Sequence, residues 1–225
     1  MLWWIEFGPS SSGRHGLRRV ASIVSHTSAV LGITRFRRRA LWSTIDATLR
    51  DAMPRFLAQP GIEDAWLGRR GPEVDDERVV ASVWSSPEAE RTAARLPEML
   101  DDIGADIDPP SRIVLPLVLD LRFPRPDPPS ILRIYEGETK PGELEAYVED
   151  ARRGSLRDGE REDGPIAVCM SVDPPDRFIT ASVWTGWASI EACTGGDIHR
   201  PLLTRNVARL AAGGPTHYEV VLIDR

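Results

Sequence analysis

The tetrapeptide Ala-Ser-Val-Trp occurs twice in this chain of 225 residues, at 81–84 and again at 181–184. Each copy ends an apolar run and is followed by small polar residues, which is typical of a strand that leads into a turn. Similar segments at a fixed spacing are the signature of a structural unit that occurs more than once. The sequence therefore predicts that one unit has been duplicated.

The elements predicted around the two copies follow the same order. In the helix predicted at 43–59, apolar residues recur every three or four positions and so share one face; they are Ile45, Leu49, Met53 and Phe56. The other expected helices are 87–99, 141–154 and 186–193. The expected strands are 29–36, 62–70, 112–121, 130–137, 165–173, 216–224 and the two segments that carry the tetrapeptide.

This order is β-α-β-β-α-β in each half, which is that of the ferredoxin-like motif. Such a sheet has helices on one face only, and a bare apolar face of that size is rarely left in water. Residues on the strand that ends at Trp184 are apolar on both sides, with Phe178 facing one way and Ile179 the other. We therefore expect an α+β fold in which two ferredoxin-like repeats pack sheet to sheet as a barrel within one chain.

The predicted boundaries follow from composition. The first repeat spans 29–123 and the second 130–225, joined by a proline-rich linker at 124–129. Residues 1–28 match nothing in the second half and are expected to be an extension that is disordered in part. The polar, glycine-rich stretch 154–164 is expected to be a mobile surface loop.

Charge and cysteine content exclude several classes of protein. A net charge of −6 argues against nucleic acid or an anionic membrane surface as partner. No apolar run approaches the roughly 20 residues that span a bilayer, and the N-terminus lacks the features of a signal peptide. Cys169 and Cys193 form neither a disulfide framework nor a zinc-binding pattern. The expected location is the cytoplasm, with no metal site.

Two regions resemble the antibiotic biosynthesis monooxygenase family of the dimeric α/β-barrel superfamily. They are QPGIEDAWLGRR (59–70) leading to ERVVASVWSSPEA (77–89), and RFITASVWTGWASIEACTGGDIHRPLL (177–203) leading to THYEVV (216–221). The resemblance implies a chain that is a fused dimer, and oxidation of an aromatic substrate by O2 without metal, flavin or other cofactor. Heme-degrading members pair the tryptophan with an asparagine and a histidine that this chain lacks at the matching places, so heme degradation is not expected.

Candidate site residues concentrate in the second repeat, because no histidine falls in the core of the first. A histidine is the natural acid or base near neutral pH, and an indole offers a flat apolar wall. The catalytic candidates are His199, His217 and Tyr218. The substrate-binding candidates are Trp184, Trp187, Arg133, Tyr135 and Trp84. Trp84 and Trp184 fit a core position at a strand end better than a pocket wall, and Trp187 also fits an anchor for its short helix. Arg133 and Tyr135 share one face of their strand and are solvated if that face is the outer one.

Three functions remain open from the sequence. The first is a cofactor-independent monooxygenase that acts on a small aromatic or hydrophobic molecule in a pocket of the second repeat. The second is a barrel without catalysis that binds a small molecule or a protein partner. The third is an isomerase or lyase acting on a small ring. A homodimer is compatible with all three.

Overall fold

The computed structural model describes residues 22–23, 28–37, 42–70, 77–93, 107–201 and 205–221. The first half contains β1 (Ser22–Ile23), β2 (Val30–Arg37), α1 (Trp42–Leu57), β3 (Ile62–Arg70), β4 (Glu77–Trp84), α2 (Pro87–Thr92) and β5 (Ser111–Arg122). The second half contains β6 (Ile131–Thr139), α3 (Leu144–Glu160), β7 (Ala167–Asp173), β8 (Arg177–Trp184), α4 (Trp187–Thr194), η2 (Arg205–Arg209) and β9 (Leu210–Val221). The predicted α+β class is confirmed. The disorder predicted within 1–28 concerns residues that lie mostly outside the described ones.

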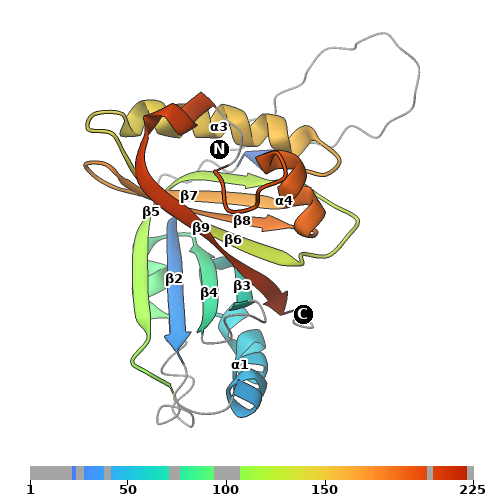
Figure 1. Cartoon of the computed structure of the whole chain (residues 1–225). Helices are drawn as coiled ribbons and strands as arrows, with labels where there is room; N and C mark the ends of the chain where they lie inside the picture. Colours follow the sequence, from blue (N-terminus) through green and yellow to red (C-terminus); the bar gives the residue numbers. More distant parts are fainter. Residues whose placement is uncertain are drawn as a thin grey trace.

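The nine strands form one antiparallel sheet that closes on itself. Their order is β1-β5-β2-β4-β3-β9-β6-β8-β7, and β7 pairs back to β5. Closure depends on two long strands: β5 pairs first with β2 and then with β7, and β9 pairs with β6 and then with β3. In Figure 1, β9 runs diagonally between the group of β6, β8 and β7 and the group of β2, β4 and β3. A closed ring of this kind leaves no long strand edge unpaired.

The inside of the ring is packed with apolar side chains from both halves. Leu31, Ile33 and Val83 come from the first half, and Leu132, Ile134 and Val183 from the second. Ile179 faces this interior, whereas Phe178 packs against α3 on the outside, as the alternation along β8 predicts. Both faces of the sheet are therefore covered, the inner one by the opposite strands and the outer one by helices.

The helices cover the outer face through the predicted apolar stripes. In α1, Leu49, Met53 and Phe56 are buried against β2, β3 and β4. In the second half, Tyr147 of α3 packs on Phe178 with ring centroids 4.4 Å apart. Figure 1 shows α3 lying across one group of strands and α1 beside the other.

The sequence prediction for the end of α3 is wrong. The helix does not stop at Gly154 but continues to Glu160, so the expected mobile loop at 154–164 is largely helical. Gly154 and Asp158 are buried at the contact with the sheet. Gly159 is required by close packing, because a Cβ there would lie 2.1 Å from the ring of Phe123.

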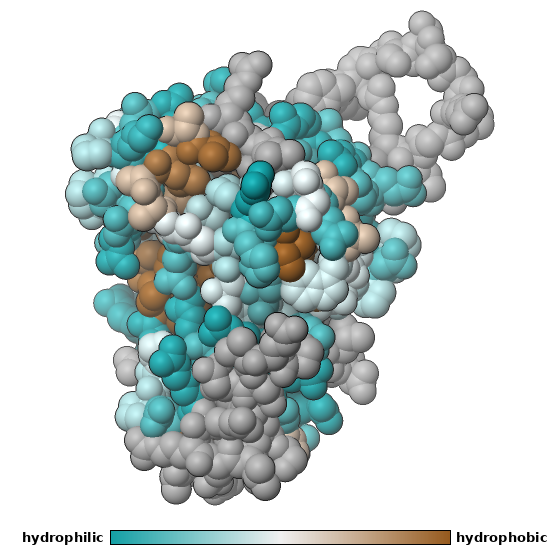
Figure 2. Space-filling model, in the orientation of Figure 1, coloured by the Kyte–Doolittle hydropathy of each residue, from teal (hydrophilic) through white to brown (hydrophobic). Residues whose placement is uncertain are grey.

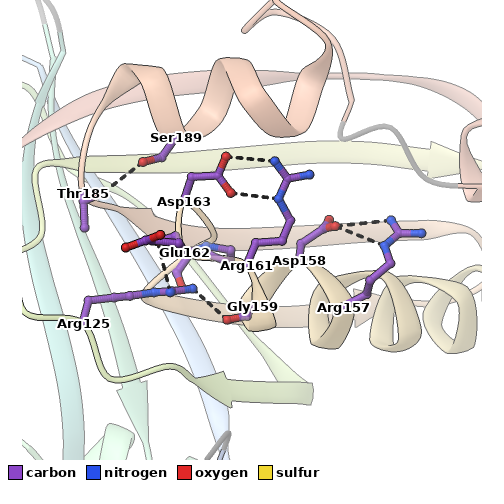
Figure 3. A network of polar contacts seen from close by, with 10 residues as sticks. Arg125, Arg157, Asp158, Gly159, Arg161, Glu162, Asp163, Thr185 and Ser189 are labelled. Atoms are coloured by element: carbon purple, nitrogen blue, oxygen red, sulfur yellow. Dashed lines mark hydrogen bonds and ion pairs between the residues drawn. The ribbon is translucent and has the colours of Figure 1, made fainter. Parts of the chain in front are cut away.

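Charged residues that look like a solvated loop in the sequence form a local network around the end of α3 (Figure 3). Arg161 donates two hydrogen bonds to the carboxylate of Asp163, at 2.8 and 2.9 Å. Arg125, from the linker between β5 and β6, donates to the carbonyl oxygen of Gly159 at 2.7 Å. These bonds attach the linker to the helix end and account for the order of a polar segment.

The surface of the molecule agrees with a sheet whose two faces are both covered. On the face shown in Figure 2, hydrophilic residues predominate and hydrophobic ones gather in small separate areas. None of the helices in the described part of the chain is long and apolar enough to cross a bilayer. Cys169 and Cys193 are both buried and free.

Candidate functional site

Polar side chains line up across the outer face of the second-half sheet. Arg133 on β6 lies opposite Ser182 on β8 and opposite His217 on β9. Cross-strand partners point to the same side of a sheet, so these three side chains form one row. In the adjacent row, Tyr135 lies opposite Thr180. The sheet thus presents a cation, an imidazole and several hydroxyl groups to the side that α3 covers.

A small cavity of about 50 Å³ lies between this face, α3 and the segment that ends at Pro201. Its polar lining comes from Arg133, Tyr135, Tyr147, Ser155, Thr180 and Ser182. The volume suits a few water molecules and is far below the roughly 300 Å³ at which ligand pockets begin. A ring-sized ligand therefore has to displace part of the cover.

A larger open hollow of about 340 Å³ lies elsewhere, at the ends of β6 and β7 near Glu138 and Asp173. Among the residues that line it, none has a buried side-chain nitrogen or oxygen without a hydrogen-bond partner. The smaller cavity does contain such a residue, Arg133. We therefore place the candidate site at the smaller cavity.

Arg133 is the most unusual residue of the site. Its side chain is buried, with 3% of the residue exposed, and its Nη2 donates to the carbonyl oxygen of Arg200 at 2.7 Å. Its Nε has no hydrogen-bond partner among the described residues, and the guanidinium carbon lies 5.6 Å from the ring centroid of Tyr135. Burial lowers the pKa of Arg133 to about 10. The positive charge of Arg133 is therefore buried away from water, and its neighbours offset little of the cost of desolvation.

His217 and His199 lie together beside Arg133. Their ring centroids are 6.0 Å apart, and the ring of Trp187 is 5.3 Å from that of His217. Nε2 of His217 is buried and has no hydrogen-bond partner in the part of the chain that the structure describes, whereas His199 is exposed. Burial first, then the positive charge of Arg133 and the neighbouring His199, lower the pKa of His217 to about 4. His217 is therefore neutral at pH 7.

Tyr218 lies apart from this cluster, although it is the next residue after His217. Successive residues of a strand point to opposite faces, so Tyr218 points into the barrel and belongs to the inner core. There its hydroxyl donates a hydrogen bond to the carboxylate of Glu77. Burial raises the pKa of Tyr218 well above its usual range.

The two tryptophans that end the third strands occupy matching core positions. Nε1 of Trp184 donates to Oγ of Ser182 at 2.9 Å, and Nε1 of Trp84 donates to Oγ of Ser82 at 3.0 Å. Trp84 packs edge-on against Phe56 in the core beneath α1. Neither Trp84 nor Trp184 lines the cavity.

The corresponding place in the first half carries no such cluster. Gly32 lies opposite Ser82 and Val114, the positions that match Ser182 and His217 in the second half. Gly32 therefore stands where Arg133 stands, and a Cβ added to it would meet Oγ of Ser82 at 2.9 Å. At these matched positions the first half has Gly32 and Val114 where the second half has Arg133 and His217.

Sequence reasoning brought forward Arg133, Tyr135, His199, His217 and Trp187, which the structure places in one neighbourhood. It missed Tyr147, which the helical pattern assigns to the core stripe, and it missed Ser182 and Thr180. The sequence did contain a signal for Ser182 and Thr180. They alternate along the strand with apolar residues that point to the other face, and they share the face of Trp184. The described residues contain no group of three or more His, Cys, Asp or Glu that could hold a metal ion.

Several solved structures share this fold at low sequence identity. A candidate monooxygenase from Fusobacterium nucleatum matches with a TM-score of 0.72 and 9% identity, covering 89% of this chain and 96% of that one. A candidate monooxygenase from Lactobacillus acidophilus gives 0.66 and 9%, covering 86% and 93%. An anthrone oxidase-like protein gives 0.55 and 12%, covering 89% and 94%. No protein-family model matches the chain, and no curated protein matches its sequence. The chain thus shares its overall fold with these proteins.

Proposed function

We propose that this chain is a cofactor-independent, monooxygenase-like protein that acts on a small aromatic molecule at the outer face of β6, β8 and β9. The observation that carries the proposal is a pair of cross-strand neighbours, Arg133 and His217, that each bury a nitrogen with no hydrogen-bond partner among the described residues. Such orphaned polar atoms are costly in a folded protein and cluster where a ligand completes their hydrogen bonds. The cavity beside them supplies further hydroxyl groups.

We also propose that the barrel arose by duplication, with units at 29–123 and 130–225. In support, the strand order within the ring is β5-β2-β4-β3 in one half and β9-β6-β8-β7 in the other, which is the same order of corresponding strands. The hydrogen bond from tryptophan to serine is made in both halves, at Trp84 and at Trp184. A duplicated unit can lose its site in one copy while keeping its packing, which fits Gly32 in place of Arg133.

The chemistry that this site suits is oxidation of an activated ring carbon. In the proposed reaction a CH2 group next to an oxyanion reacts with O2; one oxygen atom becomes the new carbonyl, and the other leaves as water with the two hydrogens. Arg133 and the hydroxyl groups of Tyr135 and Tyr147 would stabilise the oxyanion, whose charge makes the ring a one-electron donor. His217, with the exposed His199 beside it, would connect the reacting carbon to solvent for proton exchange.

Oxygen uptake tests the proposal. The protein is mixed with anthrone or a hydroxylated anthrone, which carry one activated CH2, and dissolved O2 is followed together with quinone absorbance. We expect one quinone for each O2 consumed, and a loss of about 100-fold or more in kcat/KM for Arg133→Met because the oxyanion loses its cation.

Arg153→Gln is the matched control, since Arg153 is an exposed arginine of α3 that pairs with Glu149 outside the site. It should retain wild-type turnover. If no hydroxyaromatic compound is consumed above the rate without protein, oxygenase function is excluded for that substrate class.

A barrel that binds without catalysis is the second candidate, and one observation favours it. The cavity of about 50 Å³ is bounded on one side by Pro201, which follows the Arg200 carbonyl that binds Arg133, and this volume leaves little room for both a substrate and O2. Binding of the same compounds with no uptake of oxygen would select this function.

A further inference from the structure

Arg133 differs from every other buried charged side chain in the described part of the chain. Six charged residues there are buried, and five of them have a partner of opposite charge. Those five are Arg78 with Asp46, Glu77 with Arg35 and Arg37, Glu90 with Arg112, Asp120 with Arg122, and Asp158 with Arg157. Arg133 has none among the described residues, and its one hydrogen bond goes to a neutral carbonyl.

A buried guanidinium without a counter-ion destabilises the protein that carries it, because its desolvation is not offset by a nearby negative charge. The fold shows the ordinary remedy elsewhere: Arg78, 1% exposed, has both oxygens of Asp46 at 2.7 and 2.9 Å. At Arg133 none of the described residues places a negative charge in the site. A cost of this kind is typical of a position where a ligand supplies what is missing.

The residues that line the cavity also favour a negatively charged ligand. Apart from Arg133, the polar groups that the described residues contribute to the cavity are hydroxyl groups, with no carboxylate among them. Burial raises the pKa of Tyr135 and of Tyr147, so both phenols remain neutral donors. One cation surrounded by O–H donors, with the flat rings of Tyr135 and Tyr147 as walls, is suited to an oxyanion on a planar molecule.

We infer that the ligand enters this site already ionised, as a flat aromatic or enolic oxyanion that pairs with Arg133, such as a hydroxybenzoate or a hydroxyquinone. The inference rests on the proposed function and identifies its preferred ligands as acids that are ionised at neutral pH. Neutral compounds, such as simple phenols and anthrone itself, should bind more weakly.

The protein itself is poorly equipped to ionise a neutral phenol. The nitrogen base nearest to Arg133 is His217, whose pKa of about 4 makes it a weak base. Moving a proton to it from a phenol with a pKa near 10 is unfavourable by about six powers of ten before any stabilisation of the product. An acid that has lost its proton in solution avoids this step.

The segment that covers the site provides a route by which the anion enters. The segment between α4 and Pro201 begins with Gly195 and Gly196, whose φ angles of 72° and 90° lie in the left-handed region. It reaches the site through the carbonyl oxygen of Arg200, the acceptor for Arg133. An oxyanion is a stronger acceptor than a carbonyl, so the ligand replaces this contact as it displaces the segment.

Matched pairs of probes test the charge requirement by isothermal titration at pH 7.5. The pairs are 2-hydroxybenzoate against 2-hydroxybenzamide, and 2-hydroxy-1,4-naphthoquinone, an acidic enol, against its 2-methoxy ether. In each pair the anion should bind more tightly by about tenfold or more, the worth of a charge-assisted hydrogen bond. The first pair tests a carboxylate and the second an enolate, so the two sources of negative charge are distinguished.

Three variants locate the preference. Arg133→Met should abolish it, Arg133→Lys should keep part of it, and Arg153→Gln, at an exposed arginine of α3, should leave it unchanged. Equal affinity for anion and neutral partner in the wild-type protein overturns the inference, as does an anion preference that survives Arg133→Met.

Unfolding of the free protein supplies a test that needs no ligand. Arg133→Met removes an unpaired charge and should raise the Tm by a few degrees, whereas Arg78→Met breaks a paired charge and should lower it. If both variants lose stability to a similar degree, Arg133 has a structural counter-charge and the inference fails. If the Arg133→Met variant does not fold, the inference also fails.

The outcomes separate this inference from the proposed function. Anions that bind without consuming O2 support the charge requirement and contradict the oxygenase. Neutral hydroxyaromatics that turn over without any anion preference do the reverse.

Discussion

At the scale of single residues, His217 and Tyr218 show how one step along a strand separates chemistry from structure. His217 faces the candidate site, while Tyr218 faces the inner core and donates to Glu77, a carboxylate that is 3% exposed. The sequence brings the two forward as a pair, and only the alternation of β9 separates them. Because β9 is paired on both edges, this orientation is fixed by its ladders with β6 and β3.

Tyr218→Phe should therefore change stability and leave function intact. Loss of a hydrogen bond to a buried carboxylate costs about 1.5–3 kcal/mol, which for a chain of this size lowers the Tm by roughly 3–12 °C. Ligand binding and oxygen uptake should match the wild type, since the hydroxyl points into the barrel. Thermal unfolding and the oxygen electrode measure the two quantities. A variant of wild-type stability that has lost turnover would return Tyr218 to the catalytic group.

At the scale of elements, the periodicity of apolar residues and the residues that cap helices predicted most of the fold. The strands carry apolar residues on both faces, and Oγ of Ser86 accepts the hydrogen bond from the amide of Ala89 that starts α2. Two ends were wrong for a common reason. A glycine ordinarily predicts a break, yet Gly154 lies inside α3 and Gly213 lies inside β9, opposite Gly137. At Gly213 a Cβ would lie 2.4 Å from the carbonyl oxygen of Glu136, and such a contact comes from a distant part of the chain.

The candidate site, like the fold, could be predicted from the sequence only in part. Arg133, His199 and His217 could be proposed because their residue types carry chemistry. The lack of a counter-ion at Arg133 could not, since it depends on which strands become neighbours and on a carbonyl oxygen from Arg200. Hydrogen bonds between side chains that lie 32 or 141 residues apart in the sequence are decided by topology, as Arg78 with Asp46 and Tyr218 with Glu77 show.

Gly159→Ala tests the packing argument at the end of α3. Alanine in place of a helical glycine ordinarily stabilises by up to about 1 kcal/mol. Here the added methyl would lie 2.1 Å from the ring of Phe123, so the sign should reverse and the Tm should fall by several degrees. Gly186→Ala is the control, because a Cβ at Gly186 meets no atom within 4 Å. Equal effects of the two substitutions would show that the contact with Phe123 relaxes freely.

At the scale of the whole molecule, the two halves are joined by more than the linker. The ring closes through β3 with β9 and through β5 with β7, and each of these ladders joins a strand of one half to a strand of the other. Arg69 and Glu219 form an ion pair across the first of these ladders. The inner core mixes side chains from both halves. Neither half, taken alone, has its inner face covered.

A fragment of residues 130–225 should therefore pair with a second copy of itself. With β3 absent, the outer edge of β9 is unpaired, and the strand that corresponds to β3 in the second half is β7. Two copies can close a ring by pairing β9 of each with β7 of the other, which covers both apolar inner faces. Light scattering should give twice the fragment mass, with reversible dissociation on dilution. The dimer should be less stable than the full chain, because Tyr218 would meet Arg177 at the position that matches Glu77. A folded monomer of this fragment would contradict the duplication, since one sheet would then be stable with its inner face in water.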